Sequence, residues 1–250
     1  RDRLRSRGLG DVYKRQKQYQ RLIDSIKIQD IKVNIIGIDN RNQVYKSCSR
    51  ALNDAIYRVN TKYVLFSHQD IIFNSPTALN RILEYLNCIN ESDILGVAGS
   101  SFNSIYVKTN VLVGNCDELE YGGTERVNGI EECNTLDECL FGGYTEYFRK
   151  TKFDESICYG WHLYAVEICL RTMYNGGKIY VCDVELIHKS KGKLDYSYNE
   201  MYRLLCKKYS GSYKYLRTPC CYYSGTSFLK RNIYYLKKLM GLKIRNLREK

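Results

Sequence analysis

Short apolar runs alternate with helical repeats along most of this chain, and that alternation constrains the fold more than any other feature of the sequence. Runs typical of strands occupy residues 32–38, 62–67, 94–101, 135–142 and 178–187. Apolar residues at steps of three and four predict helices over residues 19–26, 47–59, 76–86, 161–174, 198–209 and 228–247. The poorly periodic stretch 102–134 is expected to be a long loop with one strand near residues 105–113. The alternation predicts an α/β fold with a mostly parallel sheet flanked by helices, followed by C-terminal helices.

The chain is long enough for one domain with its own core. Its 250 residues are 44% hydrophobic and 26% charged, which is ordinary for a globular protein. Only two prolines occur, so no Pro-rich linker divides the chain. Apolar runs such as residues 63–67 and 94–99 are far shorter than the roughly 20 residues of a transmembrane helix. We therefore assign residues 17–220 to a single folded domain.

Both ends of the chain differ from this domain. Residues 1–16 lack an apolar period and resemble translated vector sequence, so we expect a non-native or disordered tail there. Residues 221–250 contain a basic amphipathic helix. Its apolar stripe consists of Leu229, Ile233, Leu236, Met240, Ile244 and Leu247. Such a helix either contacts an anionic membrane surface peripherally or packs on its own domain with a solvated basic face.

Most of the net charge of +12 lies in the two ends, residues 1–16 and 226–250. The nearly neutral body lacks the basic footprint of a nucleic-acid binder, so no nucleic-acid partner is expected. The eleven cysteines form no CxxC pair, and no apolar signal-peptide core follows the basic start. We therefore expect reduced thiols and a cytoplasmic location, either free or at the inner face of the membrane.

Polar side chains follow several of the predicted strands. In open α/β sheets, ligands bind at the carboxyl ends of the strands. This rule selects Asp39, the run His68-Gln69-Asp70, and His188. A carboxylate such as Asp70 at this edge suits a hard divalent cation that also binds a diphosphate. A plain turn or helix-capping residue is the alternative.

Two groups of motifs resemble glycosyltransferase family 2, whose members have the nucleotide-sugar-binding GT-A fold. The first group is Asn53-Asp54-Ala55-Ile56 followed by Tyr63-Val64-Leu65-Phe66-Ser67-His68-Gln69-Asp70. The second group contains Phe153-Asp154-Glu155, Trp161-His162-Leu163-Tyr164-Ala165-Val166-Glu167, Cys169-Leu170-Arg171, Gly176-Gly177 and His188. Their order and spacing, over about residues 17–220, are more specific than any single motif. The His-Gln-Asp and Trp-His variants are similar to bacterial members associated with surface polysaccharide.

The resemblance implies an enzyme that transfers a sugar from a nucleotide-diphosphate donor to a saccharide or lipid-linked acceptor, with inversion. It implies a Mn²⁺ or Mg²⁺ cofactor held by Asp70 and His188. One carboxylate stands where the family has an acidic triplet, so His68 and Gln69 are expected to support Asp70 in binding the donor. Because the acidic triplet is reduced to one carboxylate, the alternative is a degenerate relative that binds carbohydrate or nucleotide without catalysis.

The catalytic base has two candidates, because the family's Glu-Asp pair is replaced here. Counting forward from residues 153–155 favours His162, whereas counting back from the segment that ends at Arg171 favours Glu167. A histidine near neutral pKa or a partly desolvated glutamate can take the proton of an acceptor hydroxyl. Trp161 offers an indole face to a sugar ring, or fills a core contact together with His162. Glu167 can instead form a buried ion pair with Arg171, four residues on.

The resemblance also assigns contacts to donor and acceptor. Lys189, with residues 190–192, is expected at the diphosphate, and Asn53 and Asp39 on the nucleotide side. Asp137 lies on the predicted strand that passes beneath the acceptor, where it is expected to bond a sugar hydroxyl. Members of the family open with a strand before their first helix, so we expect this chain to lack that strand.

Overall fold

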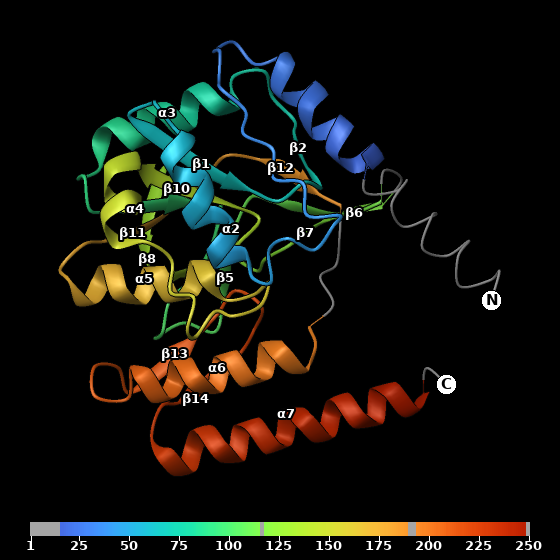
Figure 1. Cartoon of the computed structure of the whole chain (residues 1–250), viewed down its shortest axis with the longest axis vertical. Coiled ribbons are helices and arrows are strands. Elements are labelled where there is room, and N and C mark those ends of the chain that lie inside the picture. The colour runs from blue at the N-terminus through green and yellow to red at the C-terminus, as the bar shows by residue number, and fades with distance from the viewer. Residues whose placement is uncertain (1–15, 116–117, 190–193, 249–250) are drawn as a thin grey trace.

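The computed structural model describes residues 16–115, 118–189 and 194–248. The predicted tail lies outside this part of the chain except for Gln16, which belongs to a helix over residues 16–27. The predicted donor segment 190–192 also lies outside the described residues. The described chain forms three layers, in which a mixed sheet lies between two groups of helices (Figure 1).

The central sheet has the strand order β1-β10-β3-β11-β8. Its strands are β1 (Tyr63–Ser67), β10 (Leu140–Tyr144), β3 (Ile94–Gly96), β11 (Ile179–Cys182) and β8 (Ile130–Cys133). β3 and β11 pair in parallel, whereas β1 with β10, β10 with β3, and β11 with β8 pair antiparallel. The prediction of a mostly parallel sheet is therefore wrong. The stretch 102–134, predicted to be mainly loop, contains β8, which runs antiparallel to β11. The chain then continues to β10, which lies between β1 and β3 and runs antiparallel to both.

Three predicted strands each divide between two sheets. Residues 94–101 form β3 and β4 (Ala98–Ser100), residues 135–142 form β9 (Thr135–Leu136) and most of β10, and residues 178–187 form β11 and most of β12 (Leu186–His188). The smaller sheets are β2-β12-β6-β7, β5-β4-β9 and β13-β14. Their other strands are β2 (Ile71–Phe73), β5 (Val107–Thr109), β6 (Leu112–Asn115), β7 (Glu118–Tyr121), β13 (Tyr215–Arg217) and β14 (Tyr223–Gly225). The chain thus leaves the central sheet after β1 and after β11 to build the β2-β12 sheet.

Most of the predicted helices form, with shifted ends. They are α2 (Cys48–Ala55) with the 3₁₀ turn η1 (Ile56–Arg58), α3 (Ala78–Cys88), α5 (Tyr164–Tyr174), α6 (Tyr196–Lys208) and α7 (Phe228–Arg248), and the short α4 (Thr145–Thr151) is an addition. The Ser47 hydroxyl caps α2 by accepting the Arg50 N–H at 3.2 Å. α3 begins at Ala78 rather than Pro76, because the Ser75 hydroxyl accepts the Thr77 N–H in a turn of its own.

Residues 32–38, predicted as a strand, do not form one. Val33 and Ile35 are 40% and 46% exposed, and no described strand pairs with this run. A β-branched sequence needs a neighbouring strand to complete its ladder of hydrogen bonds, and here the described chain supplies none. This prediction is therefore wrong.

Alternation along the central strands creates a core on each face of the sheet. In β3, Ile94 packs in the core shared with α2, α4, α5 and α6, and its neighbour Leu95 in the core shared with α3 and the helix over residues 16–27. Phe141 and Leu140 of β10 divide in the same way. Successive side chains of a strand point to opposite faces, so each short strand supplies both cores.

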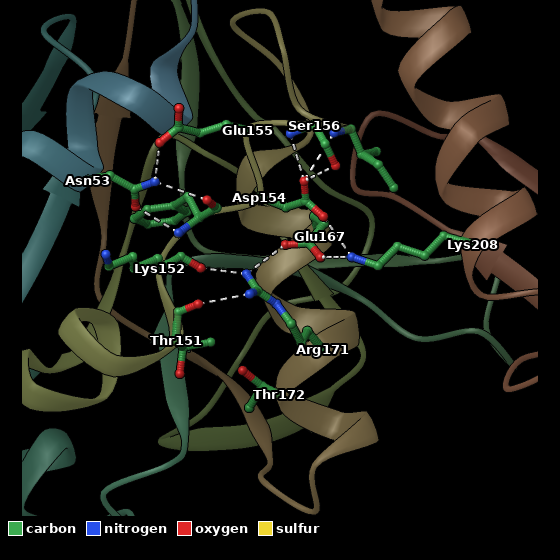
Figure 2. Close-up of polar contacts among 12 residues, drawn as sticks. Asn53, Thr151, Lys152, Asp154, Glu155, Ser156, Glu167, Arg171, Thr172 and Lys208 are labelled. Carbon is green, nitrogen blue, oxygen red and sulfur yellow. Dashed lines mark hydrogen bonds and ion pairs between the residues drawn. The ribbon is translucent and has the colours of Figure 1, made fainter.

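A buried polar network ties α5 to α6 and to the loop after α4 (Figure 2). The Glu167 side chain is fully buried, and its carboxylate accepts hydrogen bonds from Arg171 at 2.9 Å, Lys208 at 2.7 Å and the Tyr209 hydroxyl at 3.0 Å. Lys208 also pairs with Asp154 at 2.8 Å. Asp154 is half-buried, but Lys208 and neighbouring donors outweigh burial and lower the pKa of its carboxyl. The network thus holds two helices and one loop together at a single carboxylate.

Replacing Glu167 with Gln should lower the free energy of unfolding by about 2 kcal/mol, because Arg171 and Lys208 each lose a charge-assisted hydrogen bond. The loss stays below that of an isolated buried pair, because both cations keep other partners. Urea denaturation at pH 7 measures this loss.

The matched control is Glu132→Gln, which removes an exposed pair with Lys178 at 3.0 Å. Its stability should change by less than about 0.5 kcal/mol. A Glu167→Gln protein as stable as the Glu132→Gln control would contradict the role assigned to the network.

Candidate active site

Three side chains converge where β1 ends, β2 begins and β12 ends. The ligand atoms of His68, Asp70 and His188 all lie within 4.8 Å of one another. β2 and β12 pair antiparallel with Ile71 opposite His188, and the Lys189 N–H donates to the Asp70 carbonyl at 2.9 Å. Of the three residues expected to converge at this edge, Asp70 and His188 lie together with His68, whereas Asp39 is not among them. We call His68, Asp70 and His188 the His-Asp-His cluster.

The Asp70 carboxylate sets the charge state of the cluster. Its Oδ1 lies 3.3 Å from His188 Nε2, and the two side chains are only 11% and 14% exposed. Burial opposes the charged form of His188, but the facing carboxylate outweighs it and holds the pKa of His188 above its usual 6.5. For His68, burial dominates and lowers the pKa. The cluster thus combines one imidazole paired with a carboxylate and one that is neutral near pH 7.

The donor set of the cluster suits a divalent transition metal. His188 Nε2 is buried and makes no well-aligned hydrogen bond, although it faces Asp70. Two imidazole nitrogens and one carboxylate oxygen match the ligands of Mn²⁺ or Zn²⁺ better than those of Mg²⁺, which takes mainly oxygen. His68, Asp70 and His188 therefore fit a bound cation.

Asp137 lies beside the cluster, in the turn between β9 and β10 rather than on a strand. Its Oδ1 accepts the Cys139 N–H at 2.9 Å, which fixes the side chain. Its negative charge acts to raise the pKa of both His68 and His188, so the carboxylate lies within electrostatic range of the two rings.

Trp161 and His162 lie just before α5 instead of within it. Trp161 is 46% exposed, which leaves an indole face open to a ligand. His162 packs edge-on against Tyr198, with ring centroids 5.5 Å apart, and burial lowers its pKa. A charge on His162 also acts on the pKa of His68, so His162 borders the His-Asp-His cluster. Gln69 is exposed between His68 and Asp70.

Three predicted site residues have other partners. Glu167 forms the alternative ion pair with Arg171 within the buried network described above. Asn53 donates to the Phe153 carbonyl at 3.0 Å and to Glu155 at 2.8 Å, so it fixes the loop after α4 (Figure 2). Asp39 is exposed and pairs with Arg41, which lowers the pKa of Asp39 to about 2. The described contacts bring none of the three into the cluster.

Sequence reasoning overlooked Glu138, which follows Asp137 directly. Glu138 is buried, and its Oε1 accepts the N–H of Leu163. Leu163 is fully buried in a left-handed conformation, with φ of 66°, which a leucine rarely adopts. Glu138 therefore supports the strained turn that carries His162. The available signal was the acidic pair Asp137-Glu138 just before an apolar strand, but the sequence did not indicate that Glu138 is buried.

The same carboxyl should make stability depend on pH. Burial, reinforced by the charge of Asp137, raises the pKa of Glu138 to about 8, whereas an exposed glutamate titrates near 4.5. Between these values the unfolded chain releases a proton that the folded chain keeps, so this contribution to stability falls as pH rises. Glu138→Gln keeps an acceptor for Leu163 and should lose this part of the pH dependence.

Urea denaturation at several pH values from 5 to 8 measures the effect for the wild type and for Glu138→Gln. The exposed Glu132→Gln variant should follow the wild type. If Glu138→Gln also keeps the wild-type pH dependence, Glu138 is ionised in the folded protein at neutral pH.

Comparison with known proteins identifies a family. Residues 12–209 match the model of the family described as "Glycosyltransferase like family". The chain is 23% identical over 207 residues to "ATP synthase subunits region ORF 6" of Fuscovulum blasticum, which covers 78% of this chain and 79% of that protein. It also aligns with the crystal structure of GalNAc-T7 with UDP, GalNAc and Mn²⁺, at 7% identity and a TM-score of 0.44. That alignment covers 64% of this chain and about a third (34%) of the GalNAc-T7 chain. Because the family model matches well over half of its residues, this chain belongs to the glycosyltransferase-like family.

Proposed function

We propose that this protein transfers a sugar from a nucleotide-diphosphate donor to a saccharide or lipid-linked acceptor, with the help of a divalent cation. The observation that carries the proposal is the His-Asp-His cluster, whose ligand atoms lie within 4.8 Å of one another in a chain of the glycosyltransferase-like family. A cation bound there would neutralise the charge on the departing nucleotide diphosphate. The GT-A fold and a role in bacterial surface polysaccharide, both implied by the sequence motifs, belong to this proposal.

The donor would be held by residues on both sides of the cluster. Asp70, His188 and His68 would hold the cation, and the adjacent Lys189 and Gln69 would contact the diphosphate. Asp39 is retained as a contact on the nucleoside side, since it is exposed and ionised at neutral pH. For Asn53 we propose positioning of the loop after α4, because both ends of its amide are used there.

His162 is our choice for the base of an inverting transfer. Its lowered pKa leaves the ring neutral near pH 7, so it can accept the proton of the acceptor hydroxyl while that oxygen attacks the anomeric carbon. Trp161 would stack on a sugar ring, and Asp137 would accept a hydrogen bond from a sugar hydroxyl. Glu167 is the weaker candidate, because its carboxylate is occupied by Arg171, Lys208 and Tyr209.

We place the reaction in the cytoplasm, on the strength of the cysteine pattern. The described cysteines are free thiols, as expected in a reducing compartment. The reaction class itself is accessible to a direct test.

Asp70→Asn should abolish cation-dependent binding of a nucleotide diphosphate while leaving the fold intact, because it removes the one carboxylate of the cluster. Mn²⁺ binding followed by electron paramagnetic resonance, with and without nucleotide diphosphate, provides the readout. A screen of nucleotide-sugars for released nucleotide diphosphate then identifies the donor. Asp24→Asn, which changes an exposed carboxylate on the helix over residues 16–27, is the matched control.

The donor set also predicts the choice of metal. Mn²⁺ should bind more tightly than Mg²⁺ and support faster release of nucleotide diphosphate, because two of the three ligands are imidazoles. If the Asp70→Asn protein binds Mn²⁺ as tightly as the wild type, the His-Asp-His cluster is not the cation site.

His162→Ala should lower turnover by about 10²–10⁴-fold with little change in donor affinity, since it removes the proton acceptor and leaves the cation ligands in place. In the wild type, turnover should fall at acid pH as His162 becomes protonated below 6.5, and the variant should lack this limb of the profile. Steady-state rates across pH 5–8 report both effects.

The non-catalytic alternative predicts different results in the same experiments. It predicts binding of cation and nucleotide that depends on Asp70, with no turnover for any donor and no effect of His162→Ala. The observation that favours this alternative is that Asp70 is the one carboxylate of the cluster, where the family has an acidic triplet.

A further inference from the structure

Helix α7 carries an apolar stripe that points away from the protein. The stripe residues are between 52% and 73% exposed, and they are Leu229, Ile233, Leu236, Met240, Ile244 and Leu247. The helix has 21 residues, about 31 Å in length, and forms the outer edge of the molecule alongside α6 (Figure 1). A row of large apolar side chains of this length on the surface needs a partner.

The opposite face of α7 already binds the domain. Leu242 is buried, and the Lys238 ammonium lies 4.0 Å from the centre of the Tyr222 ring. Arg245 donates to the Leu194 carbonyl at 2.8 Å, and Arg231 donates to the Thr226 carbonyl at 3.0 Å. The sequence left open whether the stripe packs on its own domain. These contacts show that the opposite face of the helix packs on the domain, while the stripe stays exposed.

The borders of the stripe are positively charged. Lys230, Lys237 and Lys243 are exposed. At about 100° per residue, Lys230 and Lys237 border one edge of the stripe and Lys243 the other. The sequence of α7 contains no Asp or Glu. An apolar stripe between two basic edges is the pattern of a helix that lies in the plane of an anionic membrane surface.

Charge decides between a membrane and a second copy of the chain. A second copy would bring an identical set of lysines to the interface without a compensating carboxylate on α7. Anionic lipid headgroups are complementary to those lysines, and the acyl region accepts the stripe. In the described part of the chain, no helix has the length and apolar character required to cross a bilayer.

We propose that α7 binds the interface of an anionic lipid bilayer, with the apolar stripe in the acyl boundary and Lys230, Lys237 and Lys243 at the headgroups. Arg245 ties the C-terminal part of α7 to Leu194 of the domain. Membrane binding itself does not depend on the proposed reaction.

The test is flotation of the full chain with lipid vesicles. The wild type should float with vesicles of phosphatidylcholine and phosphatidylglycerol in equal amounts and stay behind with phosphatidylcholine alone, and added salt should weaken flotation. Leu236→Glu with Met240→Glu should reduce the bound fraction by about tenfold or more, because two charges enter the apolar stripe. Both residues face solvent, so circular dichroism and the melting temperature should be unchanged.

Ile105→Glu is the matched control, because Ile105 is 73% exposed on a different part of the molecule, and this variant should float like the wild type. Asp70→Asn should also float, so a failed enzyme assay leaves this result unaffected. Absence of flotation with the mixed vesicles would overturn the proposal. So would a concentration-dependent dimer in analytical ultracentrifugation that the Leu236→Glu, Met240→Glu protein cannot form.

Discussion

The antiparallel pairing of β2 with β12 is the constraint on which the candidate site depends. It sets Ile71 opposite His188, and the hydrogen bond from the Lys189 N–H to the Asp70 carbonyl extends this register by one residue. Lys189 and not His188 lies opposite Asp70 in this register, so strand alternation alone would point the Asp70 side chain to the other face. Asp70 lies in the turn before β2, and this turn brings its carboxylate to 3.3 Å from His188 Nε2. The side chains of the cluster therefore meet because the paired strands bring the end of β12 next to the turn that precedes β2.

Burial then acts on the ionisable groups with different results, according to their neighbours. His188 faces Asp70, and its pKa rises in spite of burial. For His68, which lies within 4.8 Å of Asp70, and for His162, burial outweighs the attraction of nearby carboxylates and lowers the pKa of each ring. Neutral imidazoles are what both a metal ligand and a general base require. The balance between burial and the facing carboxylate thus gives these three rings different properties.

The sequence predicted the elements whose signal is local, and it failed where the signal depends on partners. β1 and α6 form as expected from a buried apolar run and a helical repeat, and Asp70 and His188 lie near the ends of strands. The apolar run 94–101 carries no sign that the chain changes sheets at Val97, because both halves are equally buried. The run 32–38 has high strand propensity and no neighbour among the described strands. Glu138 was missed because an acidic residue reveals its burial only in three dimensions.

Helix α7 shows the same distinction between pattern and partner. Its repeat of apolar residues suggests the face that packs on a core, since that is the usual reason for such a stripe. Instead, packing is achieved by a face of mixed character, where Tyr234 and Leu242 are combined with Lys238 and Arg245, whose long side chains lie against rings and carbonyls. Aromatic rings and basic side chains can satisfy a helix–domain contact that aliphatic residues normally make. This frees the aliphatic stripe for a second surface, so one helix can bind its own domain and a lipid bilayer at the same time.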